Sequence, residues 1–254
     1  MRKTIMLALF LSLISFSFAN NSEFYNSLID KGNLAYDEGK YDSSITFYSQ
    51  VVNADFQSAT LFYNLGNAYY KNQELAPAIF YYERALKLTP SDPDIKFNIN
   101  MANQLITDKI QEKPVAILTQ AYQWVSTIFT LDQWCMATII FLIMGLVFMS
   151  IYLLTQNVGI KRLSFFGAIG LFALHISAVI IGQMVKNSLN TKNNAIVFTG
   201  TLTVKSEPKI NSSALFVIHE GTKVTVFQDG ETWLRIALPD GNEGWAKAED
   251  LKTY

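Results

Sequence analysis

The sequence contains little of what enzyme and metal sites are usually built from. Among its 254 residues there is one cysteine, Cys135, and there are two histidines, His175 and His219. A single cysteine excludes a disulfide within the chain, and two histidines far apart in sequence predict no metal site. The sequence also lacks a glycine-rich phosphate loop, a G-x-S-x-G motif and paired carboxylates on a pocket-like framework. We therefore expect no enzymatic activity, no cofactor and no metal.

Charged residues are also scarce. They make up 16% of the chain, and the formal net charge is −1. Residues 20–113 contain 12 acidic and 8 basic residues, and residues 194–254 contain 8 acidic and 6 basic residues. Neither region is a basic patch that could neutralise a phosphate backbone. The composition therefore predicts no nucleic-acid partner.

Residues 1–19 are typical of a secretory signal peptide. Arg2 and Lys3 form a short positive start, an uncharged and mostly apolar run covers 5–18, and Ser17-Phe18-Ala19 ends it with a small residue on either side of a phenylalanine. We predict that cleavage after Ala19 exports the rest of the chain. The alternative is an N-terminal anchor that stays uncleaved.

Two longer apolar runs predict a hairpin of transmembrane helices. No charged residue occurs over 134–160 or over 163–185, and each run exceeds the ~20 residues that a helix needs to cross the hydrocarbon layer. Lys161 and Arg162 are the only charges between them, which predicts a cytoplasmic turn at 161–162. Together with the signal peptide, this predicts an inner (cytoplasmic) membrane protein whose two soluble domains are periplasmic. Two buried core helices are the alternative, but no soluble domain large enough to enclose them remains.

The segment before the first long run is uncharged as well. Residues 114–131 read PVAILTQAYQWVSTIFTL, in which threonine, glutamine and serine interrupt the apolar positions. This mixture favours a helix over 114–133 that lies in the membrane interface. A third transmembrane span is the alternative, and it would move the C-terminal region to the other side. A linker over 186–193 follows the second long run.

The N-terminal region repeats itself with a period of 34 residues. The segment KGNLAYDEGKYDSSITFYSQVV (31–52) aligns without a gap with LGNAYYKNQELAPAIFYYERAL (65–86), so Gly32 and Gly66 occupy equivalent positions. This period and these residues resemble the tetratricopeptide (TPR) repeat, a helix–turn–helix unit. The resemblance implies that the two glycines lie where paired helices approach closely.

A closing helix is expected after the second unit, because each unit buries its apolar face only against a neighbour. Residues 92–110 carry an apolar stripe at helical spacing, which predicts a long helix that continues towards the membrane and completes an all-α TPR domain over 20–113. The resemblance implies a concave groove, lined by the first helix of each unit, that holds a partner's peptide. Mapped onto this sequence, the groove residues are Asn26, Ile29, Asn33, Tyr36, Asp37, Thr60, Tyr63, Asn67, Tyr70 and Lys71.

Some relatives of the TPR repeat clamp a C-terminal carboxylate in this groove. Asn33 and Asn64 match two positions of that clamp. Ile29, Asp94 and Asn98 stand where the clamp has basic residues, so the sequence does not support carboxylate binding. The asparagines are then either groove contacts or consensus residues that stabilise helix packing.

Residues 194–254 change to short β runs separated by turn residues. Asp229-Gly230 and Asp240-Gly241 predict hairpins, because glycine tolerates the positive φ of tight turns. The order LTVKSEP, EGTKVTVF and DGETWLRIALPDGNEGWAKAEDL resembles the bacterial SH3-like family, an all-β small barrel. Trp233 and Trp245 line a ligand groove there or are half-buried barrel residues. The predicted strands are Val197–Thr199, Leu202–Lys205, Lys223–Phe227, Trp233–Ala237 and Gly244–Ala246.

The whole arrangement is multidomain: a signal peptide, TPR repeats, a membrane hairpin and an SH3-like barrel. It resembles the BatE-like proteins of the Bacteroidetes aerotolerance operon. The resemblance implies a complex with von Willebrand A-type membrane proteins and a MoxR-type ATPase, linked to oxygen tolerance or envelope stress. We expect a scaffold or adaptor that binds protein partners through the TPR groove. The alternative is a cell-wall sensor or anchor that binds peptidoglycan through the SH3-like domain.

Overall fold

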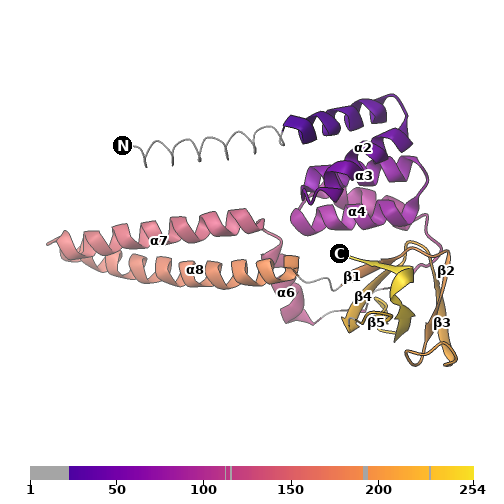
Figure 1. Cartoon of the computed structure of the whole chain (residues 1–254). Coiled ribbons are helices and arrows are strands. Elements are labelled where there is room, and N and C mark those ends of the chain that lie inside the picture. The colour runs from indigo at the N-terminus through magenta and orange to yellow at the C-terminus, as the bar shows by residue number, and fades with distance from the viewer. Residues whose placement is uncertain (1–22, 112, 115, 191–193, 229) are drawn as a thin grey trace, which may run out of the picture.

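The structure is a computed structural model that describes residues 23–111, 113–114, 116–190, 194–228 and 230–254. The predicted signal peptide over 1–19 lies outside the described residues. Figure 1 shows a helical N-terminal part, a long helical hairpin and a C-terminal sheet, which are the three parts of the predicted fold class. We call residues 23–103 the repeat domain and residues 194–254 the β domain.

The repeat domain consists of two helical pairs and a closing helix. The first pair is a helix over 23–37 with α2 (Tyr41–Asn53), the second is α3 (Ala59–Lys71) with α4 (Leu75–Leu88), and α5 (Pro93–Asn103) closes the stack. Each pair turns through one residue in the left-handed region, Gly39 in the first unit and Gln73 in the second. The helices share a continuous core that includes Tyr48, Phe62 and Tyr82.

The closing helix is shorter than the sequence predicts. Asp92 caps its start by accepting hydrogen bonds from the backbone of Asp94 and Ile95, but the helix ends at Asn103 rather than continuing through Ile110. Residues 104–111, which we call the strap, leave the helix because their apolar side chains pack elsewhere. Ile106 packs against the repeat core and Ile110 packs against the core of the β domain.

The hairpin consists of α7 (Leu131–Leu154) and α8 (Val158–Asn190), preceded by the short helix α6 (Ile117–Ser126). Thr130 and Gln133 form a reciprocal capping box at the start of α7. The break between the long helices falls at 155–157, not at the predicted 161–162. The Asn157 side chain accepts hydrogen bonds from the backbone of Gly159 and Ile160 and so starts α8 before the basic pair. Lys161 and Arg162 therefore belong to the first turns of α8.

The two long helices pack closely through glycines. A Cβ at Gly167 would lie 2.5 Å from the Phe148 ring, and one at Gly145 would lie 3.1 Å from the Phe172 ring. Both helices are long and apolar enough to cross a membrane, and only 6% and 17% of their most apolar windows are buried, so neither is a core helix. His175 Nδ1 lies 2.9 Å from the backbone oxygen of Thr138, which makes a polar contact across the hairpin.

The β domain is an antiparallel sheet with the strand order β3-β2-β6-β5-β4-β1-β7. It contains two strands that the sequence analysis missed, β3 and β7, and its core includes Val204, Val224 and Ile236. Gly241, in the turn between β5 and β6, has a φ of 86°. The strands are β1 (Asn194–Val197), β2 (Thr201–Lys205), β3 (Ala214–His219), β4 (Lys223–Gln228), β5 (Trp233–Ala237), β6 (Glu243–Lys247) and β7 (Leu251–Thr253).

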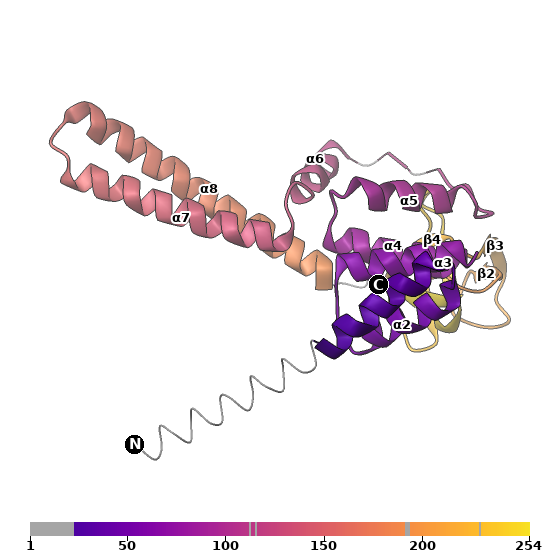
Figure 2. The same ribbon diagram turned by 90° about the horizontal axis from the view of Figure 1, so that it is seen from above.

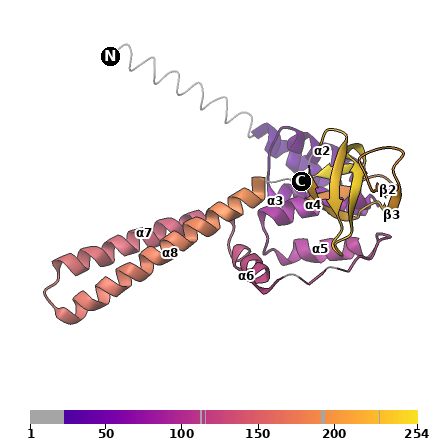
Figure 3. The ribbon, with the colours of Figure 1, turned by 90° about the horizontal axis from the view of Figure 1, so that it is seen from below.

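The two soluble domains lie against each other at one end of the hairpin, which projects away from them (Figures 2 and 3). The contact is formed by α4 and the β1–β7 edge of the sheet. Ile196 and Tyr254 of the β domain are buried in the core cluster of the repeat domain, and the rings of Phe198 and Tyr254 each meet Phe80 edge-on at 5.8 Å between centroids. Segments from the two ends of the chain thus share one core.

Candidate functional site

The groove of the repeat domain is built from pairs of residues that recur with the 34-residue period. The Tyr48 hydroxyl donates to Asn33 Oδ1 at 2.7 Å, and the Tyr82 hydroxyl donates to Asn67 Oδ1 at 2.8 Å. Both tyrosines come from the second helix of their unit and reach the first helix where a glycine leaves room. The repeat therefore places the same tyrosine–asparagine pair twice along the groove.

These hydrogen bonds fix which way the asparagine amides point. Burial raises the pKa of both Tyr48 and Tyr82, so their hydroxyls stay protonated and act as donors. An asparagine oxygen accepts these bonds, so the amide nitrogen is turned away from the tyrosine. Within the described residues, the side-chain nitrogens of Asn33 and Asn67 donate to no protein group, and both asparagines face the groove.

The closing helix contributes a third amide to this row. Asn98 Nδ2 donates to Asn67 Oδ1 at 2.8 Å and lies 3.0 Å from the hydroxyl of Tyr63. Asn64 Nδ2 lies 3.5 Å from Asn33 Oδ1, which links the two repeat units. Asparagines from three helices are thus connected along the floor of the groove.

The groove surface contains two adjoining hollows that share Tyr36 and Asn67. One has a volume of about 370 Å³ and the other about 330 Å³. The first is lined by Asn33, Tyr36, Asp37, Tyr48, Asn64 and Asn67, and the second by Tyr36, Tyr63, Asn67, Tyr70, Lys71, Tyr82, Phe97, Asn98 and Met101. The lining combines amide donors, tyrosine rings, one carboxylate at one end and one ammonium at the other.

The structure brings together seven of the ten groove residues named from the sequence. They are Asn33, Tyr36, Asp37, Tyr63, Asn67, Tyr70 and Lys71. Asn26, Ile29 and Thr60 lie outside both hollows. Ile29 packs against the repeat core instead, while Asn26 and Thr60 are exposed.

Six lining residues were not among the ten named, and two of them, Asn64 and Asn98, entered the sequence analysis only as positions of the carboxylate clamp. Tyr48 and Tyr82 sit on second helices, which the mapping left out, although their 34-residue spacing marks them as equivalent. Phe97 and Met101 are exposed by 64% and 40% on α5, and their spacing of one helical turn is the signal that could have identified them.

The two tryptophans of the β domain lie on the outer face of the sheet. Trp233 and Trp245 alternate along β5 and β6 with buried Leu234, Ile236 and Ala246, and both are partly exposed. Trp245 pairs across the strands with Arg235. This face is therefore half-apolar and accessible, whereas the opposite face forms the core of the domain.

The junction between the two domains contains polar contacts that the sequence analysis did not anticipate. Glu83 on α4 accepts hydrogen bonds from Lys223 Nζ at 2.7 Å and from the Tyr254 hydroxyl at 3.0 Å, and its side chain is 9% exposed. Burial and the nearby Glu83 carboxylate raise the pKa of Tyr254, so this phenol remains a donor. These partners are separated by 140 and 171 positions in sequence, so no local pattern reveals them.

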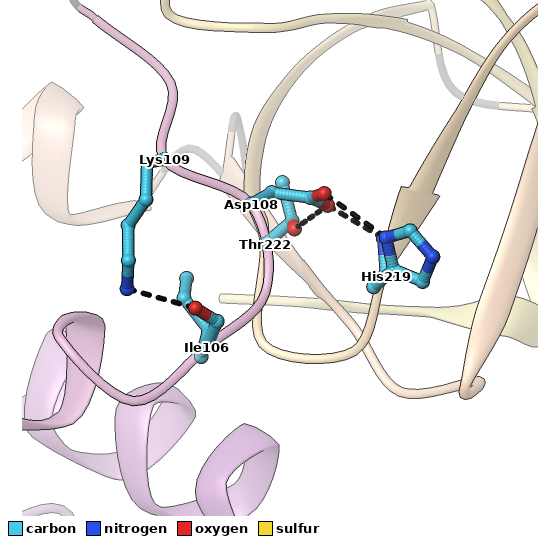
Figure 4. A network of polar contacts seen from close by, with 5 residues as sticks. All are labelled: Ile106, Asp108, Lys109, His219 and Thr222. Atoms are coloured by element: carbon cyan, nitrogen blue, oxygen red, sulfur yellow. Dashed lines mark hydrogen bonds and ion pairs between the residues drawn. The ribbon is translucent and has the colours of Figure 1, made fainter.

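A second set of polar contacts joins the strap to the β domain (Figure 4). Asp108 accepts hydrogen bonds from the His219 backbone at 2.6 Å and from the Thr222 hydroxyl at 2.7 Å, and its Oδ1 lies 3.0 Å from His219 Nδ1. Burial alone would raise the pKa of Asp108, but the hydrogen bonds from Thr222 and His219 outweigh burial and hold the pKa below its usual value. The Thr222 hydroxyl bonds to the aspartate and not to the histidine, so the trio does not form a nucleophile–base relay. Among the described residues, no group of three or more His, Cys, Asp or Glu could hold a metal ion.

Comparison with protein-family models agrees with both soluble domains. A model described as TPR repeat matches residues 32–73, one described as tetratricopeptide repeat matches residues 59–92, and one described as bacterial SH3 domain matches residues 200–252. The chain therefore contains tetratricopeptide repeats and a bacterial SH3 domain. Comparison with curated proteins gave no significant match.

Proposed function

We propose that the protein is a membrane-anchored, non-enzymatic scaffold that holds a segment of a protein partner in the groove of its repeat domain. The observation that carries this proposal is the pair of adjoining hollows over Tyr36 and Asn67, with amide nitrogens directed into them. Amide N–H groups fit the carbonyl oxygens of an extended peptide, and tyrosine rings fit its apolar side chains. Tetratricopeptide repeats typically mediate protein–protein interaction, which supports the assignment.

In this proposal α7 and α8 cross the membrane as a hairpin. Large apolar side chains are exposed along both helices, for example Ile140, Leu154 and Phe166, and would be costly to leave in water. Helix α6 lies in the membrane interface, where its exposed Ile117 and Trp124 meet the boundary between headgroups and acyl chains. With 10 residues, α6 is too short to cross the hydrocarbon layer as a third span.

We further propose that both soluble domains are periplasmic. Their shared core, in which Ile196 and Tyr254 pack among the repeats, supports a location on the same side of the membrane. The predicted signal peptide and the basic pair Lys161 and Arg162, which favours the cytoplasm, then place both domains outside the inner membrane. The resemblance to BatE-like proteins suggests von Willebrand A-type membrane proteins and a MoxR-type ATPase complex as partners in aerotolerance or envelope stress.

The scaffold proposal is tested by crosslinking in intact membranes with groove variants. We expect Tyr36→Ala combined with Tyr70→Ala to abolish capture of protein partners, because both rings line the second hollow. Phe227→Ala is the matched control, since this aromatic side chain is 62% exposed on the β domain, away from the groove. Undiminished capture of every partner by the folded double variant would exclude the groove as the binding surface.

A second candidate function is attachment to the cell wall through the β domain. The match to a bacterial SH3 domain and the partly exposed Trp233 and Trp245 on its outer face favour it. The test is co-sedimentation of the detergent-solubilised full chain with purified sacculi, since the isolated β domain would expose Ile196 and Tyr254. If the parent protein is retained and the combined Trp233→Ala and Trp245→Ala variant is not, wall binding is supported. If the parent protein is not retained, only the scaffold function remains.

A further inference from the structure

The strap crosses from the repeat domain to the hairpin by way of the β domain. Near the start of the strap, Ile106 packs against the repeat core and also lies close to Gly221 of the β domain. A Cβ added at Gly221 would lie 2.5 Å from Cγ2 of Ile106. Farther on, Ile110 packs into the core of the β domain, and the Lys113 backbone donates to the Pro239 oxygen at 3.0 Å. The chain entering α6 and α7 is therefore held by the same domain that follows α8.

The polar contacts at this junction share one arrangement. The repeat domain and strap supply the carboxylates, Glu83 and Asp108, and the β domain supplies the donors, which include Lys223, Thr222 and Tyr254. Neither carboxylate has another hydrogen-bond partner among the described residues outside the β domain. Separation of the domains would return these charged groups to water and would also expose the apolar contact of Ile196, Phe198 and Tyr254 with α4, whereas the rest of each core would remain buried within its own domain.

We propose that Glu83 and Asp108 form a two-point latch that holds the β domain against the repeats and that opens without unfolding either domain. Opening at Asp108 also releases the strap, whose eight residues span at most roughly 26–29 Å when extended. The repeats are then free to move relative to the membrane hairpin. With the latch closed, a partner bound in the groove is held at a fixed position near the membrane surface. With the latch open, the repeats and the bound partner can move away from that surface.

The latch is tested by measuring the distance between the two domains in the full chain. Spin labels are placed at Ser43→Cys on α2 and Asn211→Cys between β2 and β3, both exposed positions, in a Cys135→Ala background. Pulsed electron–electron double resonance on the parent protein in nanodiscs should give one narrow distance distribution between the two labels. Combining Glu83→Gln with Asp108→Asn should broaden it towards longer distances.

Two controls keep the outcome decisive. Glu243→Gln makes the same chemical change at an exposed pair with Arg235 on the outer face, and it should leave the distribution narrow. Hydrogen exchange should show the His219 amide of the double variant exchanging on the order of tenfold faster, as expected when a hydrogen bond to a charged group is weakened. Amides within α3, α4 and β5 should keep their protection.

Three outcomes would overturn the proposal. They are a broad distribution in the parent protein, an unchanged distribution in the double variant, and loss of protection inside α3 and α4 together with domain separation. If the double variant does not fold, the distance is measured instead in Asp108→Asn alone, which keeps an oxygen acceptor. It should give a smaller shift in the same direction, and an unchanged distribution would again count against the latch.

Discussion

The glycine in the first helix of each repeat sets how closely the two helices of the unit approach. A Cβ at Gly66 would lie 2.6 Å from Cδ1 of Tyr82, whose side chain is 1% exposed and holds Asn67 in place. Gly66→Ala gains about 1 kcal/mol of helix propensity, but overpacking a core costs about 1–3 kcal/mol. We expect a net loss of about 1 kcal/mol, seen as a lower thermal midpoint in detergent. Gly200→Ala, where a Cβ has nothing within 4 Å, is the control, and equal effects of the two would contradict the steric argument.

Glu83 is a buried carboxylate that connects the two domains, and its removal should lower the free energy of unfolding more than removal of a surface carboxylate. Glu83→Ala leaves the buried Tyr254 hydroxyl without its acceptor, which costs about 1–3 kcal/mol. Lys223, whose side chain is 43% exposed, regains water and adds little. Denaturant unfolding should show a loss of about 2 kcal/mol, against less than about 1 kcal/mol for Glu243→Ala at the exposed pair with Arg235. A loss for Glu83→Ala no larger than that of the control would show that the junction contact is not stabilising.

At the scale of helices and strands, the hairpin depends on glycines that face the opposite helix. Gly167→Leu should push α8 away from α7, because Phe148 occupies the space that a side chain would need. Disulfide formation between Thr138→Cys and His175→Cys, which replace residues in contact across the hairpin, measures the approach of the helices in a Cys135→Ala background. Gly170→Leu adds the same side chain where a Cβ meets nothing within 4 Å, and it should leave crosslinking unchanged. Efficient crosslinking in the Gly167→Leu variant would contradict this packing.

The elements that the sequence predicts well are those fixed by local or periodic patterns. The 34-residue period placed Gly32 and Gly66 at close helix contacts, and the structure confirms both through Tyr48 and Tyr82. The closing helix was predicted too long because Ile106 and Ile110 keep helical spacing while packing on different domains. Apolar residues at helical spacing indicate that a side chain is buried, but they do not indicate which part of the protein it packs against.

The same limit applies to the candidate sites. The groove residues on first helices follow from the repeat, and most of them line the two hollows. Glu83 and Asp108 could not be identified, because their partners lie more than 100 positions away and belong to another domain. Strand β3 was missed because Leu215 and Val217 are apolar yet about half exposed, so the run does not alternate as a half-buried strand should.

At the scale of the whole molecule, the attachment of the strap should depend on pH. Because the pKa of Asp108 is lower in the folded protein than in the unfolded chain, its stabilising contribution is complete above the unfolded pKa, near 3.9. That contribution is lost as the pH falls through the lower folded value. The difference in thermal midpoint between the parent protein and Asp108→Asn should therefore be full at pH 7 and should shrink as the pH falls below the unfolded pKa and through the folded pKa. Among the described residues, His219 is the titratable group that contacts Asp108. A difference that persists unchanged at low pH would exclude the carboxylate as its source.

The shared core of the two domains also leads to a prediction about membrane topology. Residues that precede and follow the hairpin, such as Phe80 and Tyr254, pack on each other, which requires that both domains lie on one side of the bilayer. In a Cys135→Ala background, Ser43→Cys and Asn211→Cys should both react with an impermeant maleimide in intact spheroplasts. Val158→Cys, at the far end of the hairpin and next to the unchanged basic pair, should react only after lysis. If the two domains are labelled differently in intact cells, an odd number of spans separates them, and neither the docked arrangement nor the latch can exist in the membrane.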